Sequence, residues 1–308
     1  MMLHVLLLTV GFVFLVKGAD WFVEGAAGIA KKLGIPQLVI GLTIVAMGTS
    51  MPEAAVSITS ALSGSAGISI GNVVGSNILN ILIILGITAV LTNVRIQKTT
   101  FRYEIPFMIG ITIILMAFGI TGNQITFLEG ILFWLLFLIF LGYLFVISKK
   151  GSVQDEEEIK ELPLWKGVLG IIIGGILVVK GSDFAVEGAT EIARYFGMSE
   201  RFIGLTIVAF GTSLPELVTS VMAAKKGNVG IAIGNIVGSN IFNILFVIGT
   251  TALICNVPFD QKFVIDTIVA IFSGVLLWAG TIRYKELRKN CGIVMLLCYA
   301  GYFIYLCK

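Results

Sequence analysis

Long runs of apolar residues follow one another along the whole chain, separated by short segments that are rich in charged residues, proline or glycine. A bilayer core is crossed by a helix of roughly 20 apolar residues. The pattern therefore predicts an all-α polytopic membrane protein with ten transmembrane helices. We expect these helices at residues 2–30, 37–62, 68–92, 103–120, 125–148, 164–193, 200–224, 229–254, 261–281 and 290–307.

The composition excludes several classes of protein. Of the 308 residues, 57% are hydrophobic and 13% are charged, and the mean hydropathy is +1.01. Ordinary soluble domains contain about 25% charged residues, so a soluble enzyme, a disordered protein and a nucleic-acid binder are all excluded. The net charge of +3 and the single histidine, His4, offer neither a basic face nor a catalytic triad. The four cysteines form no CxxC pair, which excludes a zinc site of that type.

The distribution of positive charge predicts the orientation in the membrane. Of the 21 Lys and Arg residues, 15 fall in the loops on one side of the ten spans, four fall on the other side, and Lys17 and Lys180 lie within spans. The side with more positive charge faces the cytoplasm. Both termini are therefore predicted outside, and the acidic segment 151–163 is predicted to be a cytoplasmic linker.

The chain repeats itself at a constant offset of 163 residues. Residues 39–86 align with residues 202–249 without a gap, with 29 identities in 48 positions. We therefore predict a first five-helix repeat at 1–150 and a second at 164–308. Because each repeat has an odd number of spans, the second copy enters the membrane from the opposite side. Inverted repeats of this kind are typical of secondary transporters.

Two polar motifs occur in both repeats. Residues 48–53, Gly-Thr-Ser-Met-Pro-Glu, return as Gly-Thr-Ser-Leu-Pro-Glu at 211–216, and a Gly-Asn-x-Val-Gly-Ser-Asn-Ile-x-Asn segment occupies 71–80 and 234–243. Glu53 and Glu216 fall deep inside their predicted spans. A lone carboxylate at that depth is costly and would take up a proton, so two at equivalent positions suggest a shared cation.

Hydroxyl and amide groups accompany each glutamate. Thr49 and Ser50 lie one helical turn before Glu53, and Ser76 and Asn80 are spaced to share a face of the next helix. The second repeat supplies the same groups from Thr212, Ser213, Ser239 and Asn243. These are hard oxygen ligands, which suit Ca²⁺ or Na⁺ rather than Zn²⁺ or Cu²⁺.

Proline is expected to break both glutamate-bearing helices. Pro52 has no N–H, so the carbonyl of Gly48 loses its helical donor, and Pro215 does the same to Gly211. Free carbonyls at membrane depth are tolerated where they line a cavity or bind a ligand.

Other repeated polar residues are expected to serve the structure rather than the site. We predict a packing or capping role for Asn72 and Asn235, the first asparagine of each long motif. The spacing of three residues also favours ion pairs within single helices, Lys17 with Asp20 and Lys180 with Asp183.

The duplicated motifs resemble the α-repeats of the cation/calcium exchanger superfamily, specifically its sodium/calcium exchanger branch. The resemblance covers nearly the whole chain. It implies an antiporter, not an enzyme, that exchanges Na⁺ for Ca²⁺ by alternating access and normally exports Ca²⁺. It implies no cofactor and no partners beyond these ions and the lipid bilayer. The ion ligands that it implies are Glu53, Glu216, the hydroxyls of Thr49, Ser50, Thr212, Ser213, Ser76 and Ser239, the amides of Asn80 and Asn243, and the carbonyls of Ala46 and Ala209.

The sequence departs from several relatives at one position. Archaeal and potassium-dependent exchangers carry Asp where this chain has Asn243, so only two carboxylates are expected at the site. Two negative charges balance one Ca²⁺ or two Na⁺, which weakens the case for K⁺ cotransport. The proton/calcium branch typically carries Gly-Asn-Ala-x-Glu, which argues against H⁺ as the main counter-ion.

Alternatives to a sodium/calcium antiporter remain open at this stage. A proton-coupled or K⁺-coupled Ca²⁺ antiporter could use the same oxygens, and so could a cation channel. An intramembrane enzyme lacks a Ser-His pair and paired catalytic aspartates. The large regulatory loop of animal exchangers is absent, so we expect a multi-pass protein of a prokaryotic cell membrane.

Overall fold

The computed structural model describes residues 2–149, 162–197 and 209–306. We use η for a π-helical segment. In the first half of the chain the elements are α1 (Met2–Leu33), α2 (Gln37–Ile40), η1 (Gly41–Val45), α3 (Ala46–Thr49), α4 (Met51–Leu62), α5 (Gly67–Leu79), η2 (Asn80–Leu85), α6 (Gly86–Leu91), β1 (Val94–Arg95), η3 (Thr100–Glu104), α7 (Ile105–Gly122), β2 (Gln124–Ile125) and α8 (Phe127–Lys149). In the second half they are α9 (Leu164–Tyr195), α11 (Ala209–Gly211), α12 (Leu214–Lys225), α13 (Val229–Phe242), η5 (Asn243–Ile248), α14 (Gly249–Ile254), β3 (Val257–Pro258), α15 (Gln261–Thr281), β4 (Glu286–Leu287) and α16 (Lys289–Leu306).

The predicted membrane spans are largely confirmed. Within the described ranges, eight helices are long and apolar enough to cross a membrane, and the pair Gln37–Thr49 and Met51–Leu62, bent by 49°, can form a ninth span. The boundaries of these nine lie within three residues of the prediction. The seventh predicted span begins among residues outside the described part, and the rest of it contains α11 and α12. Nearly all of the predicted acidic linker also lies outside the described residues.

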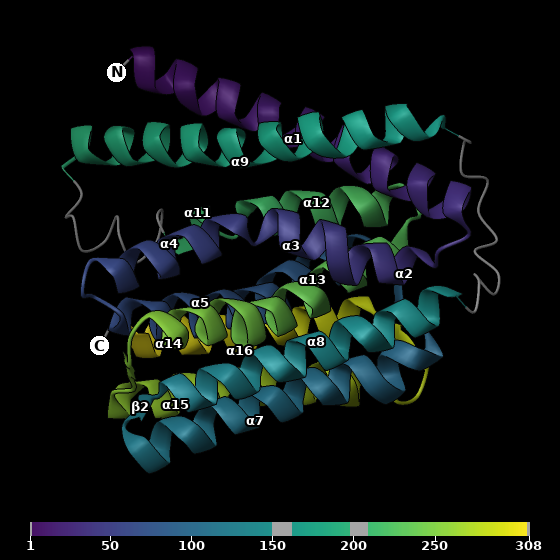
Figure 1. Cartoon of the computed structure of the whole chain (residues 1–308). Coiled ribbons are helices and arrows are strands. Elements are labelled where there is room, and N and C mark those ends of the chain that lie inside the picture. Colours follow the sequence, from purple (N-terminus) through teal and green to yellow (C-terminus); the bar gives the residue numbers. More distant parts are fainter. Residues whose placement is uncertain (1, 150–161, 198–208, 307–308) are drawn as a thin grey trace.

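The helices form layers around two central spans. In the most apolar stretch of the span α13–η5–α14, 94% of residues are buried, and in α5–η2–α6 the share is 78%, whereas in α1 it is 22%. Figure 1 shows α1 and α9 crossing each other on one side of the central spans, with α7 and α15 on the opposite side. The central position of α5 and α13 keeps their polar motifs away from lipid.

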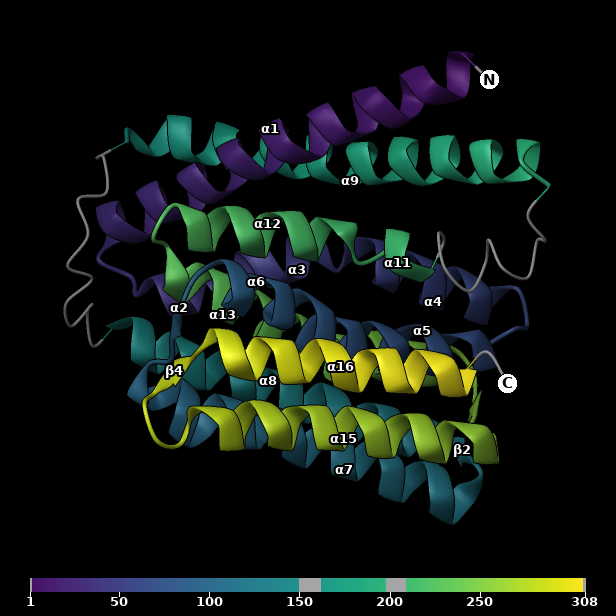
Figure 2. The ribbon, with the colours of Figure 1, turned by 180° about the vertical axis from the view of Figure 1, so that it is seen from behind.

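Two short strand pairs demonstrate the inverted symmetry. β1 pairs with β4 and β2 pairs with β3, both antiparallel. Val94 of β1 and Val257 of β3 differ by the repeat offset, so each pairing is the symmetry equivalent of the other. The two pairs lie at opposite ends of the bundle (Figure 2), as inversion requires. The helical periodicity did not predict these strands, because they depend on contacts between distant loops.

Both ends of the described chain lie at the same end of the bundle, on the left in Figure 1. An even number of membrane crossings places the two termini on one side. The arrangement therefore agrees with ten spans and with two inverted halves of five.

Glycine allows α1 and α9 to cross with their backbones in contact. A Cβ added to Gly18 would lie 2.8 Å from the carbonyl oxygen of Gly174, and a Cβ added to Gly174 would lie 2.6 Å from that of Gly18. Gly11 and Gly181 are related in the same way, at 2.8 Å. Small residues at helix crossings are typical of close packing in membranes.

One of the two predicted ion pairs within helices is wrong. Lys180 does pair with Asp183, at 3.2 Å. Asp20, however, pairs with Lys226 at the end of α12, which also pairs with Glu24 at 2.9 Å. A contact between helices has replaced the local one, since the crossing of α1 over α12 brings Lys226 to these carboxylates.

We expect Gly18→Ala and Gly174→Ala to destabilise the protein by about 1–3 kcal/mol, the usual effect of overpacking. The added methyl group would meet backbone atoms, which cannot move aside as a flexible side chain can. Thermal unfolding in detergent measures this effect. The control is Gly110→Ala in α7, where the new methyl group would meet no described atom within 4 Å. Equal unfolding temperatures for all three variants would contradict the assigned role of the crossing.

Candidate functional site

The second span is broken near its middle, and the break places Glu53 at the start of a new helix. Ser50 separates α3 from α4 in a non-helical conformation, with φ −86° and ψ 9°. Pro52, in the first turn of α4, has no N–H to continue the hydrogen bonding of the preceding helix. The second half has the same break at Ser213, with φ −92° and ψ 5°, and Glu216 lies in the first turn of α12.

The two breaks are stabilised differently. The hydroxyl of Ser182 on α9 donates a hydrogen bond of 2.7 Å to the Gly211 carbonyl, which is the one that Pro215 deprives of a helical donor. Ala19 of α1 stands at the equivalent position in the first half and has no hydroxyl to offer Gly48. The outer helix α9 therefore holds the broken span of the second half by a bond that has no counterpart at Ala19.

Glu53 and Glu216 are both buried, and each is 1% exposed. Oε1 of Glu53 accepts a hydrogen bond from Ser76 at 3.4 Å, and Oε1 of Glu216 accepts one from Ser50 at 2.8 Å. Among the described residues, Oε2 of each glutamate has no hydrogen-bond partner. No ion pair between described residues includes either glutamate. Each carboxylate thus has one hydrogen-bonded oxygen and one that is free to bind a cation.

Asn80 and Asn243 provide a second pair of unpartnered oxygens. They are the first residues of η2 and η5, where the central spans change from α-helical to π-helical geometry. Their Nδ2 atoms donate to the side chains of Asn240 and Asn77 respectively. Their Oδ1 atoms are buried and accept no hydrogen bond from the residues that the structure describes. π-helical turns within α-helices occur frequently at functional sites.

The carbonyl of Ala46 joins the two halves. It accepts a hydrogen bond of 3.4 Å from the hydroxyl of Ser239 in the other half, and it lies 3.3 Å from the hydroxyl of Thr49, whose single proton it shares with Asn235. Its counterpart Ala209 is the first residue of α11, directly after a segment outside the described residues. The ligand role that the resemblance implies for Ala209 therefore stays a prediction.

Sequence reasoning assigned Asn72 and Asn235 to packing, and both do connect neighbouring helices. Each donates to the backbone carbonyl of a site glutamate, Asn72 to Glu53 at 3.1 Å and Asn235 to Glu216 at 3.4 Å. Asn235 also accepts a hydrogen bond of 3.0 Å from Thr49. Their presence in both repeats is the signal that could have placed them beside the glutamates.

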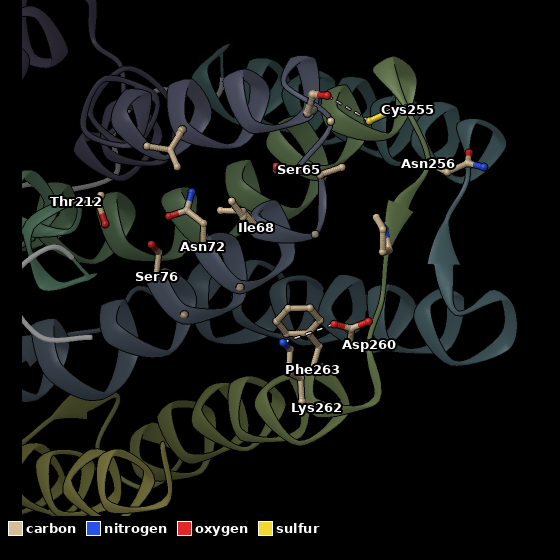
Figure 3. A pocket seen from close by; sticks show the side chains of 18 of the residues that line it. Ser65, Ile68, Asn72, Ser76, Thr212, Cys255, Asn256, Asp260, Lys262 and Phe263 are labelled. Atoms are coloured by element: carbon tan, nitrogen blue, oxygen red, sulfur yellow. Dashed lines mark hydrogen bonds and ion pairs between the residues drawn. The ribbon is translucent and has the colours of Figure 1, made fainter. Parts of the chain in front are cut away.

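A cavity of about 970 Å³ leads to the cluster from one end of the bundle. Ser76, Asn72 and Thr212 lie near one another in its lining, and Asp260 and Lys262 line it on the side away from Thr212 (Figure 3). The loop between α4 and α5 also lines it, and this is the end of the bundle where both chain ends lie (Figure 1). Because Ser76 both lines the cavity and donates to Glu53, the cavity comes within one hydrogen-bonded side chain of that carboxylate.

The free atoms of the cluster are oxygens of carboxylate and amide groups. The described residues contain no group of three or more His, Cys, Asp or Glu side chains that could hold a metal ion. A cation here would therefore be coordinated by a mixture of carboxylate, amide, hydroxyl and carbonyl oxygens. Such ligands suit Ca²⁺ and other hard cations.

Comparison with known proteins identifies the family. The family described as sodium/calcium exchanger protein matches residues 3–146 and 166–308, which include all of the cluster. The chain belongs to the sodium/calcium exchanger family. The expected resemblance is thus confirmed, and with it a cation/Ca²⁺ exchange antiport.

Full-length relatives and a solved structure agree with this assignment. This exchanger is 36% identical to the inner membrane protein YrbG of Escherichia coli, over 99% of this chain and 96% of that protein. It is 32% identical to the sodium/calcium exchanger MaX1 of Methanosarcina acetivorans, over 98% of this chain and 97% of that protein. A structure of the sodium-calcium exchanger NCX_Mj, soaked with zero Na⁺ and Ca²⁺, matches with a TM-score of 0.86 at 32% identity and covers 99% of both chains.

We expect Ser182→Ala to lower the free energy of unfolding by about 1–3 kcal/mol, since it leaves the buried Gly211 carbonyl without its donor. Thermal unfolding in detergent measures the loss. Ser148→Ala is the matched control, because that hydroxyl is exposed and donates to a carbonyl of its own helix. If both variants unfold at the wild-type temperature, the Ser182 bond does not stabilise the break.

Proposed function

We propose that this exchanger moves Na⁺ against Ca²⁺ by alternating access, normally exporting Ca²⁺, and that Glu53 and Glu216 bind the transported ions. One observation carries the proposal: Oε2 of both glutamates and Oδ1 of Asn80 and Asn243 are buried and have no hydrogen-bond partner in the described structure. A buried acceptor without a donor is costly. A bound cation would satisfy all four atoms at once. The name of MaX1, a sodium/calcium exchanger, supports the choice of ions.

The remaining ligands would come from groups around these four oxygens. Hydroxyl and carbonyl oxygens add neutral ligands, so they complete a coordination shell without changing its charge. The proposed set consists of the hydroxyls of Thr49, Ser50, Thr212, Ser213, Ser76 and Ser239 and the carbonyls of Ala46 and Ala209.

The charge of the site favours competition between the two ions. Glu53 and Glu216 together carry two negative charges, which one Ca²⁺ or two Na⁺ would neutralise. Ca²⁺ and Na⁺ therefore compete for the same carboxylates, so that Na⁺ entering down its gradient displaces Ca²⁺. Since Asn243 adds no third charge, a further K⁺ would have no carboxylate of its own.

The contrast between the two ends of the site supports alternating access. The cavity reaches Ser76 and Asn72 from one end. Toward the other end, the equivalent residue Asn235 is fully buried and accepts a hydrogen bond from Thr49. There the backbone at Gly238 lies so close to Leu42 that an added Cβ would be 2.7 Å from the Leu42 Cα. The cavity thus approaches the cluster from one side, and exchange of these contacts between the inverted halves would open the other.

The proposed orientation follows from the charge of the loops. With both termini outside, the two halves at 1–150 and 164–308 are joined by a cytoplasmic linker at 151–163, and the cavity faces the exterior of a prokaryotic cell membrane. The helices α1 and α9 would then slide over the central spans. Glycines at their crossing pack the two helices closely against each other. The ion pairs of Asp20 and Glu24 with Lys226 connect α1 to the cytoplasmic end of α12.

The proposal predicts uptake of ⁴⁵Ca²⁺ into proteoliposomes that is driven by a Na⁺ gradient. Glu53→Gln and Glu216→Gln should each abolish this flux, because glutamine keeps the shape but removes the charge that holds the cation. Glu104→Gln is the matched control, since Glu104 is equally buried but bonds to Tyr143 of α8, away from the cluster. Parallel assays under H⁺ and K⁺ gradients identify the coupling ion.

Each outcome of that assay is informative. Full flux in both cluster variants would show that the site is misplaced. Flux driven by H⁺ or K⁺ but not by Na⁺ would show that the proposed coupling ion is wrong and leave the proposed site intact. Ca²⁺ flux without any counter-ion would indicate a channel.

Acidification should inhibit exchange. A protonated carboxylic acid is neutral and loses the oxygen charge that attracts the cation. Flux should therefore fall as the pH is lowered, and higher Ca²⁺ concentrations should partly restore it because the two cations compete. Flux that stays constant down to about pH 5, close to the ordinary range of glutamate titration, would argue against carboxylate ligands.

A further inference from the structure

Four asparagines form a closed set of hydrogen bonds where α5 and α13 meet. Asn77 and Asn240 are separated by the repeat offset, and Nδ2 of each donates to the backbone carbonyl of the other, at 3.2 and 3.1 Å. Oδ1 of Asn240 accepts a hydrogen bond from Asn80 at 2.9 Å, and Oδ1 of Asn77 accepts one from Asn243 at 3.1 Å. All four side chains are buried. We call these four residues the asparagine ring.

The hydrogen bonds allow each amide of the ring a single orientation. If the amide of Asn77 were turned over, its oxygen would face the carbonyl oxygen of Asn240 and its nitrogen would face Nδ2 of Asn243. The same conflicts would arise at Asn240 with Asn77 and Asn80. A side-chain amide has a donor end and an acceptor end. Asn80 and Asn243 therefore direct their NH₂ groups toward the ring and their Oδ1 atoms away from it.

The direction of these two amides matters for cation binding. An amide oxygen attracts a cation and an NH₂ group repels it, so an asparagine is a ligand only when its oxygen faces the ion, and a partner for the NH₂ end fixes that orientation. The Oδ1 atoms that point away from the ring are the two amide oxygens without a partner in the described part of the chain. Asn77 and Asn240 supply the acceptors that hold the NH₂ groups.

We propose that Asn77 and Asn240 are positioning residues for ion binding, each holding the ligand amide of the opposite half so that its oxygen faces the cation. Asn77 orients Asn243, and Asn240 orients Asn80. The inference rests on the proposed function, because it requires Asn80 and Asn243 to bind the transported ion. Neither positioning residue touches the ion in this role. The orientation of each ligand therefore depends on the other repeat.

Asn77→Leu and Asn240→Leu test the role, since leucine has a similar shape but neither a donor nor an acceptor. Loss of a group that orients a metal ligand typically weakens metal affinity about 10–100-fold. We expect the half-saturating Ca²⁺ concentration for exchange to rise by that factor, with a much smaller change in maximal rate. If leucine prevents folding, Asn77→Ala and Asn240→Ala remove the same acceptor with a smaller side chain.

Double-mutant cycles sharpen the test, because the pairing is crossed between the halves. In an Asn243→Ala background the ligand that Asn77 orients is already lost, so adding Asn77→Leu should change half-saturation by no more than about twofold. In an Asn80→Ala background the two effects should multiply. Asn240→Leu should show the reverse pattern. Equal coupling of Asn77→Leu to both backgrounds would indicate a merely structural role and overturn the proposal.

Controls separate this inference from the proposed function. Thr88→Val and Thr251→Val remove buried hydroxyls on the same two spans that donate to carbonyls of their own helices, and half-saturation should not change. If Asn80→Ala and Asn243→Ala also leave half-saturation unchanged, the proposed site is wrong. If those variants weaken Ca²⁺ binding but Asn77→Leu and Asn240→Leu do not, only the positioning role is wrong.

Discussion

A buried carboxylate needs a positive charge close by, and inside a membrane neither lipid nor apolar side chains can provide one. Glu53 and Glu216 meet this constraint at the centre of the molecule, where each receives a hydroxyl hydrogen bond on one oxygen and keeps the other oxygen free. The helix breaks bring the two glutamates to the first turn of new helices, and the central spans α5 and α13 enclose them. Much of the surrounding architecture thus serves to hold two negative charges away from lipid in a form that a cation can neutralise.

The inverted duplication makes the site from paired parts, but the pairs are not in the same state. Glu216 accepts a hydrogen bond of 2.8 Å from Ser50 of the other half, whereas Glu53 accepts one of 3.4 Å from Ser76 of its own half. Asn235 accepts a hydrogen bond from Thr49, while Asn72 lines the cavity. These differences have a physical meaning. Two halves that share their site motifs can exchange their local conformations at small cost, and under the proposed function such a bistable arrangement lets one site face each side in turn.

The sequence predicted what depends on local pattern and on duplication, and it failed where distant contacts decide. The span at 229–254 follows from its apolar run, and Glu53 and Glu216 stand out because a carboxylate inside an apolar helix is costly. The partner of Asp20 could not be inferred, because Lys226 approaches it only when α1 packs against α12. Asn77 and Asn240 were visible as repeated residues, yet their bonds to each other require the crossing of α5 and α13.

The same electrostatic constraint accounts for exchange in place of leakage under the proposed function. When the site loses its cation, two carboxylates remain near each other in surroundings of low dielectric constant, where like charges repel strongly. The transition between facing states moves apolar helix surfaces past the site and closes it from water, which raises the cost of any uncompensated charge. An empty site therefore reorients slowly, and a site loaded with Ca²⁺ or Na⁺ reorients readily. The protein can then return to its first facing state only after it has bound the second ion. The charge of Glu53 and Glu216 therefore couples the Ca²⁺ and Na⁺ fluxes without any separate gate.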